Sequence, residues 1–200
     1  MPKKRKAPDR RIVWPAVAER HGGAAVAGKR GRVDKFRVPH GVWTIVVDRY
    51  VENSGEASQT YTRVRALFEP SLEFRFKIYR ESVFSRFAKR FGFRDATTGD
   101  PLLDRDFIVR TDNESMIRSL VQRVGLGVPL MAQPNGRFEI AKFRGKRKPR
   151  PERAAELRFL APGVVVDRDR LNSLIQLFRQ TLDGLQAIGA ATRHGVEYEL

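Results

Sequence analysis

Cysteine is absent from this 200-residue chain, which excludes disulfide bonds and thiolate chemistry. The sequence also contains no glycine-rich phosphate loop, no Gly-x-Ser-x-Gly pattern and no His-Glu-x-x-His pattern. Histidine occurs only as His21, His40 and His194, so a zinc site or a Ser-His-Asp triad would have to draw on these residues. We therefore expect a protein that is not an enzyme and that carries no cofactor and no metal.

Long apolar stretches are missing as well. No run approaches the roughly 18 residues that a membrane span requires. The N-terminal stretch lacks the apolar region of a secretory signal. We expect a cytoplasmic protein without a membrane span.

Acidic residues are few, and the densest group of them does not have the spacing of a metal site. Asp95, Asp100, Asp104 and Asp106 lack the alternating ligands, central glycine and terminal glutamate of a calcium loop. Asx turns and ion pairs with the many arginines are the simpler interpretation.

Positive charge is plentiful, and two segments carry almost all of the excess. The net charge is +16; residues 1–40 hold 12 Lys/Arg and 3 Asp/Glu, and residues 137–153 hold 8 and 2. Such a concentration predicts a polyanionic partner. The candidate contact residues are Lys3, Lys4, Arg5, Lys6, Arg10 and Arg11 in the first segment and Lys146, Arg147, Lys148, Arg150 and Arg153 in the second. The alternatives are a disordered basic arm and a loop that serves only solubility.

The domain organisation follows from these shifts in composition. Hydrophobic residues make up 41% and aromatic residues 10% of the chain, which excludes wholesale disorder. We expect a flexible basic arm over residues 1–32, one domain over residues 33–192 with a protruding basic loop at 145–153, and a loose tail over residues 193–200.

Strand patterns dominate the first half of the domain. Residues 42–50, 59–68 and 72–79 are rich in β-branched and aromatic residues or alternate between apolar and charged ones. A turn centred on Pro70 would join the last two strands as a hairpin with all apolar residues on one face. The other face would then pair Arg65 with Arg75, Arg63 with Lys77, and Tyr61 with Tyr79.

Like charges directly opposite each other are unfavourable, so this face needs a counter-charge. One interpretation supplies it from a nearby acidic residue, such as Asp48 or Glu73, or from solvent. The other is an anion-binding sheet face in which Tyr61 and Tyr79 are available for stacking.

Helical patterns alternate with strands in the remainder. We expect helices at residues 84–91, after a capping box at Thr111 and Glu114, and after Asp167, the last being the longest. Further strands are expected at residues 106–110, 128–133, 138–143 and 156–160. Short connections favour an α+β domain with mainly antiparallel sheet and three helices.

Three sequence blocks carry a resemblance. They are Trp43-x-Ile45-x-x-Asp48-x-Tyr50, Thr60-Tyr61-Thr62-Arg63-x-Arg65-Ala66 and Phe76-x-Ile78-Tyr79-Arg80, followed by Phe84-Ser85, Lys89, Gly92, Asp95, Gly99-Asp100, Asp104 and Phe107-Ile108. Over about residues 41–190 the string resembles a family of uncharacterised bacterial proteins with no assigned activity. The resemblance implies a soluble bacterial protein and transfers no catalytic residue.

Together these features predict a non-enzymatic binding module that contacts nucleic acid or another polyanion through its basic arm and loop. The alternative is a protein-interaction or structural module, for example a homodimer, whose charge serves solubility.

Overall fold

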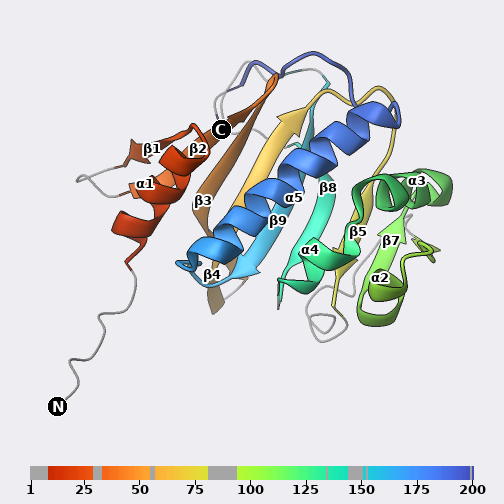
Figure 1. The fold of residues 1–200 in the computed structure, drawn as a ribbon, viewed down its shortest axis with the longest axis horizontal. Helices are drawn as coiled ribbons and strands as arrows, with labels where there is room; N and C mark the ends of the chain where they lie inside the picture. Colours follow the sequence, from red (N-terminus) through yellow and green to blue (C-terminus); the bar gives the residue numbers. More distant parts are fainter. Residues whose placement is uncertain are drawn as a thin grey trace.

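The computed structural model describes residues 9–28, 33–54, 57–80, 94–133, 135–143, 151, 153–198 and 200. In these residues a single nine-stranded sheet has the order β1-β2-β3-β4-β9-β8-β5-β7-β6, and every pairing is antiparallel (Figure 1). The strands are β1 (Ala24–Ala27), β2 (Val33–His40), β3 (Trp43–Ser54), β4 (Ala57–Phe68), β5 (Phe76–Tyr79), β6 (Arg94–Asp95), β7 (Ile108–Thr111), β8 (Arg137–Lys142) and β9 (Ala155–Pro162).

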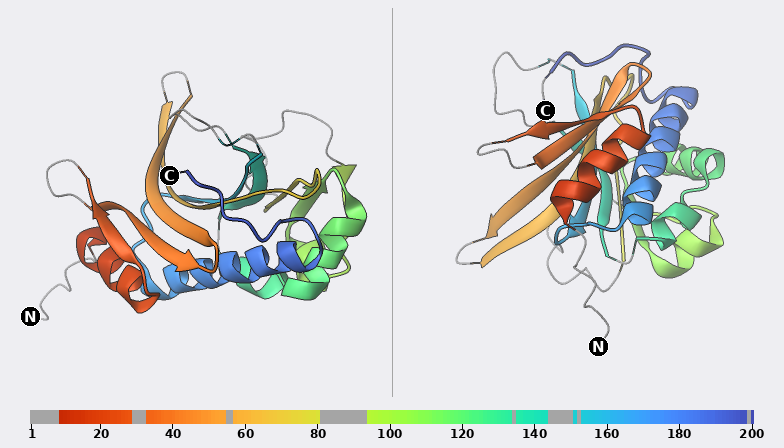
Figure 2. Two further views of the ribbon diagram at one scale, coloured as in Figure 1. Left: turned by 90° about the horizontal axis from the view of Figure 1, so that it is seen from above. Right: turned by 60° about the vertical axis from the view of Figure 1, so that its left-hand side comes forward.

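All helices of the described residues lie on one face of this sheet, and the sheet curves away from them (Figure 2). They are α1 (Arg10–Arg20), α2 (Pro101–Asp106), α3 (Glu114–Val124), α4 (Gly127–Met131) and α5 (Arg168–Ala187). The α+β class and the mainly antiparallel sheet are confirmed, but the described residues alone contain five helices, where the sequence predicts three.

The core lies between the sheet and α5, the long helix that crosses it. Phe138 on β8 packs edge-on against Phe76 on β5 and Phe178 on α5, with ring centroids 5.4 and 5.8 Å apart. All three rings are fully buried. Asp167 caps α5 by accepting a hydrogen bond from the Arg170 N–H at 2.7 Å, as its sequence position predicts.

The N-terminal segment corrects one prediction. Residues 9–28, expected to belong to a flexible arm, form α1 and β1. Trp14 is fully buried, and its indole N–H donates to the Val165 carbonyl oxygen at 2.9 Å. Its neighbours Val13 and Val17 are also buried in the core, and the surrounding charged residues hid this apolar stripe in the sequence. Residues 1–8 lie outside the described part of the chain.

The predicted hairpin is also wrong in its pairing. β4 pairs with β3 on one side and with β9 on the other, whereas β5 pairs with β8 and β7. β9 forms eight residue pairs with β4, more than the four-residue β5 could offer. Pro70 forms an isolated bridge with Ala191 instead of a hairpin turn.

Smaller corrections concern the second half. The strand expected at 128–133 is the short helix α4, and β7 starts at Ile108 because α2 ends at Asp106. The cap of α3 is Asn113, since Thr111 is still the last residue of β7. The helix expected at 84–91 lies outside the described residues.

Candidate functional site

The face of the sheet opposite the described helices, which we call the open face, is lined by charged side chains. Strand alternation turns one set of residues toward the core and the set between them toward this open face. On β4, Val64 and Ala66 belong to the core, so Arg63 and Arg65 point the other way. The curvature of the sheet makes the open face concave (Figure 2).

A row of charged residues runs straight across this face. Arg65 on β4 lies opposite Arg158 on β9, Arg158 opposite Glu139 on β8, and Glu139 opposite Lys77 on β5. Lys77 in turn lies opposite Arg110 on β7. Two of these neighbouring pairs, Arg65 with Arg158 and Lys77 with Arg110, bring like charges together, which is unfavourable without a counter-charge.

Asp48 supplies part of that counter-charge. From β3 it accepts two hydrogen bonds from Arg63, at 2.8 and 2.6 Å, and one from Arg65 at 3.0 Å. The acidic partner that the sequence offered as one interpretation is thus present for both arginines. The Arg63 guanidinium also lies 4.6 Å from the centre of the Tyr50 ring, a cation–π contact.

Glu139 and Glu156 supply the rest. Glu139 is 1% exposed, accepts a hydrogen bond from Arg137 at 3.0 Å and two from Arg158, and has Lys77 at 3.9 Å. Glu156 lies 3.8 Å from Arg65 and 3.7 Å from Arg158. The network therefore joins three carboxylates (Asp48, Glu139, Glu156) to five cations (Arg63, Arg65, Lys77, Arg137, Arg158) and is net positive.

The protonation of the network follows from these contacts. Burial raises the pKa of Glu139, but Arg137, Arg158 and Lys77 outweigh it and hold the pKa below its usual value, so the carboxylate is ionised. Burial also lowers the pKa of Arg65. The Arg65 Nε is buried and has no hydrogen-bond partner among the described residues.

A groove of about 470 Å³ opens above the row. We call it the cationic groove, because six cationic residues line it: Arg63, Arg65, Arg75, Lys77, Lys142 and Arg158. The acidic residues in the lining are Glu139 and Glu156. A second cavity of about 550 Å³ shares Arg75 and Lys142 with it and extends to Arg153.

The structure thus brings Arg63, Arg65, Arg75 and Lys77 together on one face, as predicted, although through different strand pairing. Arg75 has its own partner, since its Nε lies 2.9 Å from Asp112 Oδ2.

Tyr61 and Tyr79, which the sequence places on the same face as stacking platforms, are buried. Tyr61 is 7% and Tyr79 is 4% exposed, so neither ring is available for stacking on a ligand. Tyr50 lines the groove instead.

The residues predicted to contact a polyanion are only partly described. Arg10 pairs with Asp34 at 3.0 Å and Arg11 with Asp9 at 2.6 Å, and both belong to α1, on the face that carries the helices. Arg153 lines the second cavity, and its guanidinium lies 3.4 Å from the Pro70 carbonyl oxygen. The remaining residues, Lys3, Lys4, Arg5, Lys6, Lys146, Arg147, Lys148 and Arg150, lie outside the described part of the chain.

Sequence reasoning missed Glu139, Lys142 and Arg158. A signal was present for Glu139 and Arg158, because residues 137–140 and 156–159 alternate charged with apolar residues at the spacing of a half-buried strand. Alternation gives no such signal for Lys142, which is separated by even steps from the core residues Phe138 and Ile140. Only the pairing of these strands with β4 and β5 places the three residues beside the predicted ones.

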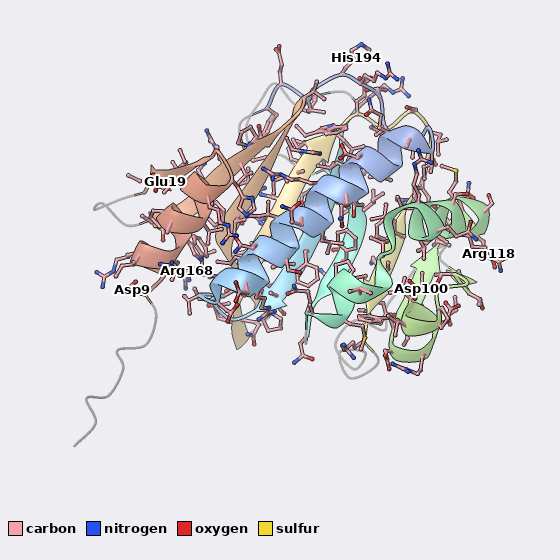
Figure 3. The ribbon with its side chains drawn as sticks, in the orientation of Figure 1. Asp9, Glu19, Asp100, Arg118, Arg168 and His194 are labelled. Carbon is pink, nitrogen blue, oxygen red and sulfur yellow. The ribbon has the colours of Figure 1, made fainter. Side chains whose placement is uncertain are left out.

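The carboxylates between residues 95 and 106 serve the local structure. Asp100 caps α2 and also accepts a hydrogen bond from the Gly127 N–H at 3.2 Å, which joins α2 to α4 (Figure 3). Burial raises the pKa of Asp104, but three hydrogen bonds from Thr98 and Gly99 lower it by more than burial raises it. The net shift of the pKa is therefore downward. Across the described ranges, no group of three or more His, Cys, Asp or Glu side chains could hold a metal ion.

None of the three histidines lines the cationic groove. His21 bonds Asn172 at 3.0 Å and His40 bonds Asp183 at 2.8 Å, both on α5. His194 is exposed on the segment that follows α5 (Figure 3).

The C-terminal segment, expected to be a loose tail, lies against the open face. The Tyr198 ring packs edge-on against Phe143 with centroids 4.8 Å apart. Lys35 on β2 donates a hydrogen bond to a main-chain oxygen of Leu200 at 2.7 Å. The physical reason is that apolar residues of the segment turn toward the sheet, since Tyr198 packs on Phe143 and Val196, Tyr198 and Leu200 line a small cavity with Val46 and Leu67.

Comparison with known proteins gives a likeness in fold. No protein-family model and no curated protein matches the sequence. Among solved structures, the mycobacterial trehalose monomycolate transport factor A, TtfA, is similar, with a TM-score of 0.54 and 10% identity. The alignment covers 90% of this chain and 96% of that chain. In the part of the chain that the structure describes, no helix has both the length and the apolar character to cross a membrane.

Proposed function

We propose that this chain is a non-enzymatic binding module that holds an anionic partner in the cationic groove. The observation that carries the proposal is the lining of that groove, in which six cationic side chains face two acidic ones on the face of the sheet that carries no helix. A concave surface with an excess of one sign of charge attracts a partner of the opposite sign.

Internal ion pairing does not cancel this attraction. The three carboxylates hold five cations in place, so the guanidinium groups are already ordered. An incoming anion therefore meets positioned donors. Binding it costs the protein less side-chain entropy than binding to flexible surface lysines would. Charge-assisted hydrogen bonds to such donors are stronger than neutral ones.

Nucleic acid is the simplest polyanion of this kind, and the basic loop supports it. Residues 144–150 are joined to the described chain at Phe143, next to Lys142, and at Pro151, two residues before Arg153. Both Lys142 and Arg153 line the second cavity. Contacts of this type would be mostly to phosphates and would carry little sequence preference.

The likeness to TtfA does not extend this proposal. That protein is named for trehalose monomycolate transport, and the same fold can support unrelated functions. The site, and not the fold, is the basis of the function proposed for this chain.

The test is binding of a fluorescent single-stranded oligonucleotide, read by anisotropy at about 50 mM salt, where phosphate contacts are strong. Arg75→Ser combined with Lys142→Ser removes two exposed cations from the groove. The matched control combines Arg123→Ser with Arg168→Ser, two exposed cations on α3 and α5. Figure 3 labels Arg168 at the start of α5.

We expect the groove variant to bind at least about tenfold more weakly, because each charge-assisted bond is worth more than about 1 kcal/mol. The control should change affinity less than about twofold. Loss of binding in the control alone, or a wild-type protein that binds neither the oligonucleotide nor a heparin fragment, would refute the proposal.

A further inference from the structure

Two buried apolar side chains lie on the open face, outside the core. Val46 lies between Ile45 and Val47, and Leu67 lies between Ala66 and Phe68; these four neighbours belong to the core, but Val46 and Leu67 do not. Strand alternation therefore places both on the face without helices. They are nevertheless only 1% and 5% exposed.

The C-terminal segment is what covers them. Val196, Tyr198 and Leu200 line one small cavity together with Val46 and Leu67. The segment is close enough that a Cβ built on Gly195 would lie 3.8 Å from Val42 Cβ. Without this segment, Val46 and Leu67 would lose part of the cover that leaves them only 1% and 5% exposed.

The covering segment has a distinctive chemistry. Residues 196–200 read Val-Glu-Tyr-Glu-Leu, so apolar and acidic residues alternate. The alternate apolar residues Val196, Tyr198 and Leu200 line the cavity with residues of the sheet, and Glu197 is exposed. Lys35 and Arg37 on β2 both donate to the same main-chain oxygen of Leu200, at 2.7 and 3.5 Å.

The segment is held weakly compared with the sheet beneath it. Among the described residues, the last backbone hydrogen bond that ties it to the body is from the Thr192 N–H to the Glu69 carbonyl oxygen, at 2.9 Å. Beyond that point it is attached by side-chain contacts and by the bonds to Leu200. Segments with few backbone bonds open at low free-energy cost.

We propose that the surface formed by Lys35, Arg37, Val42, Thr44, Val46 and Leu67, the tail-covered surface, is a docking site for an extended segment of a partner protein. That segment would carry apolar residues at alternate positions and acidic residues between them. Residues 195–198 and 200 occupy the surface as an internal substitute until such a partner displaces them. This site is separate from the cationic groove and does not depend on the function proposed for it.

The docking of the tail itself shows what the surface recognises. Alternate side chains of an extended segment point the same way, so one set can pack on Val46 and Leu67 while the acidic set stays in solvent. The adjoining cationic groove favours the approach of an acidic segment over a basic one. A partner must compete with the tail, so the affinity measured for the intact chain is lowered by the fraction of molecules in which the surface is covered.

The test uses the full chain and a fluorescent peptide with the sequence of residues 194–200, with binding read by anisotropy. Tyr198→Ala weakens the docked tail without touching the sheet. Val128→Ala, which trims an apolar side chain that is 70% exposed on α4, is the matched control. A second peptide of the same composition, with its apolar residues grouped together, separates recognition of the alternating pattern from general attraction.

An engineered cysteine pair tests whether fixing the tail in place blocks peptide binding. The chain contains no cysteine of its own, so within the chain the two new residues can pair only with each other. Val42→Cys with Gly195→Cys has a Cβ separation of 3.8 Å, which is within the roughly 3.5–4.5 Å that a disulfide requires. The new Cβ at position 195 would also lie 2.8 Å from the Val42 carbonyl oxygen, so the segment must shift slightly. Oxidation locks the tail in place, and reduction of the same sample releases it.

We expect Tyr198→Ala to bind the alternating peptide about tenfold more tightly than the wild type and Val128→Ala to match the wild type. The oxidised cysteine pair should bind it at least about tenfold more weakly than the reduced form. Equal binding by wild type and Tyr198→Ala, or equal binding of the two peptides, would overturn the proposal. A concentration-dependent dimer of Tyr198→Ala or of the reduced pair on size exclusion would overturn it in favour of tail exchange between two copies. The peptide assay contains no nucleic acid, so its outcome and that of the oligonucleotide assay are independent.

Discussion

The two faces of the sheet are built from the same strands and differ in almost every other respect. On the covered face, Phe138 packs edge-on against Phe76 and against Phe178 of α5, and all three rings are fully buried. On the open face, the side chains between them are Lys77, Arg137 and Glu139, joined in one ionic network. Removal of apolar area from water stabilises the first face, whereas the second is held by interactions whose net contribution is small. Most of the fold's stability therefore comes from the covered face, and the charged side chains of the open face remain for binding.

The largest expected effect is on the covered face. Phe138→Ala should lower the free energy of unfolding by about 3–5 kcal/mol, because the cavity it leaves is surrounded by Phe76, Phe159 and Phe178. Urea denaturation followed by circular dichroism measures this. A loss below about 1 kcal/mol would mean that the helices do not seal this face.

A charge at the centre of the open face comes next. Glu139→Gln keeps the shape but leaves Arg137, Arg158 and Lys77 without their shared carboxylate. We expect a loss of about 3 kcal/mol, typical of breaking a buried ion pair by removing one partner. Glu73→Gln, on an exposed side chain, is the control and should change stability by less than about 0.5 kcal/mol. Equal effects in the two variants would show that the network is only a surface feature.

The same carboxylate sets a pH dependence. The pKa of Glu139 is held below its usual value of 4.5, so its contribution to stability is complete above that value and is lost as the pH falls through the folded-state pKa. Thermal melts between about pH 6 and pH 3 should therefore lose less stability in Glu139→Gln than in the wild type. A steeper acid loss in the variant would contradict the direction of the shift.

The smallest expected effect on stability is at the rim of the groove. Arg75→Ser removes a half-exposed side chain whose ion pair with Asp112 is screened by solvent. We expect a change of less than about 1 kcal/mol in the free energy of unfolding. A larger loss would mean that Arg75 holds the connection between β4 and β5 in place and that it cannot serve as a neutral probe of binding.

Sequence alone could predict the faces but not the neighbours. Alternation along residues 72–79 puts Lys77 on the opposite side from Phe76 and Ile78 whichever strand lies beside it. The alternation does not identify the neighbouring strand. The hairpin interpretation therefore pairs Lys77 with Arg63, whereas its neighbours in the structure are Glu139 and Arg110. Periodicity was decisive for α5, where a cap at Asp167 and a regular apolar stripe agree.

The missed parts share a different cause. Trp14 lies among basic residues, and Tyr198 lies between glutamates, so composition suggested solvent exposure for both segments. Trp14 is buried in the core together with Val13 and Val17, and the Tyr198 ring packs on Phe143, so apolar contacts outweigh the polarity of the neighbouring residues in both segments. The candidate site needed long-range pairing, since Lys77 and Arg158 are on strands brought together only by β8.

The measurement that tests the central claim most directly is the salt dependence of anion binding. The slope of log K against log salt for a single-stranded oligonucleotide reports the number of phosphate contacts, at about 0.7 per contact. We predict that Arg75→Ser with Lys142→Ser reduces the magnitude of this slope by about 1.4. Arg123→Ser with Arg168→Ser, on the helix-covered side, should leave it unchanged. An equal slope in all three proteins, or a reduction only in the helix-side variant, would contradict the assignment of binding to the open face.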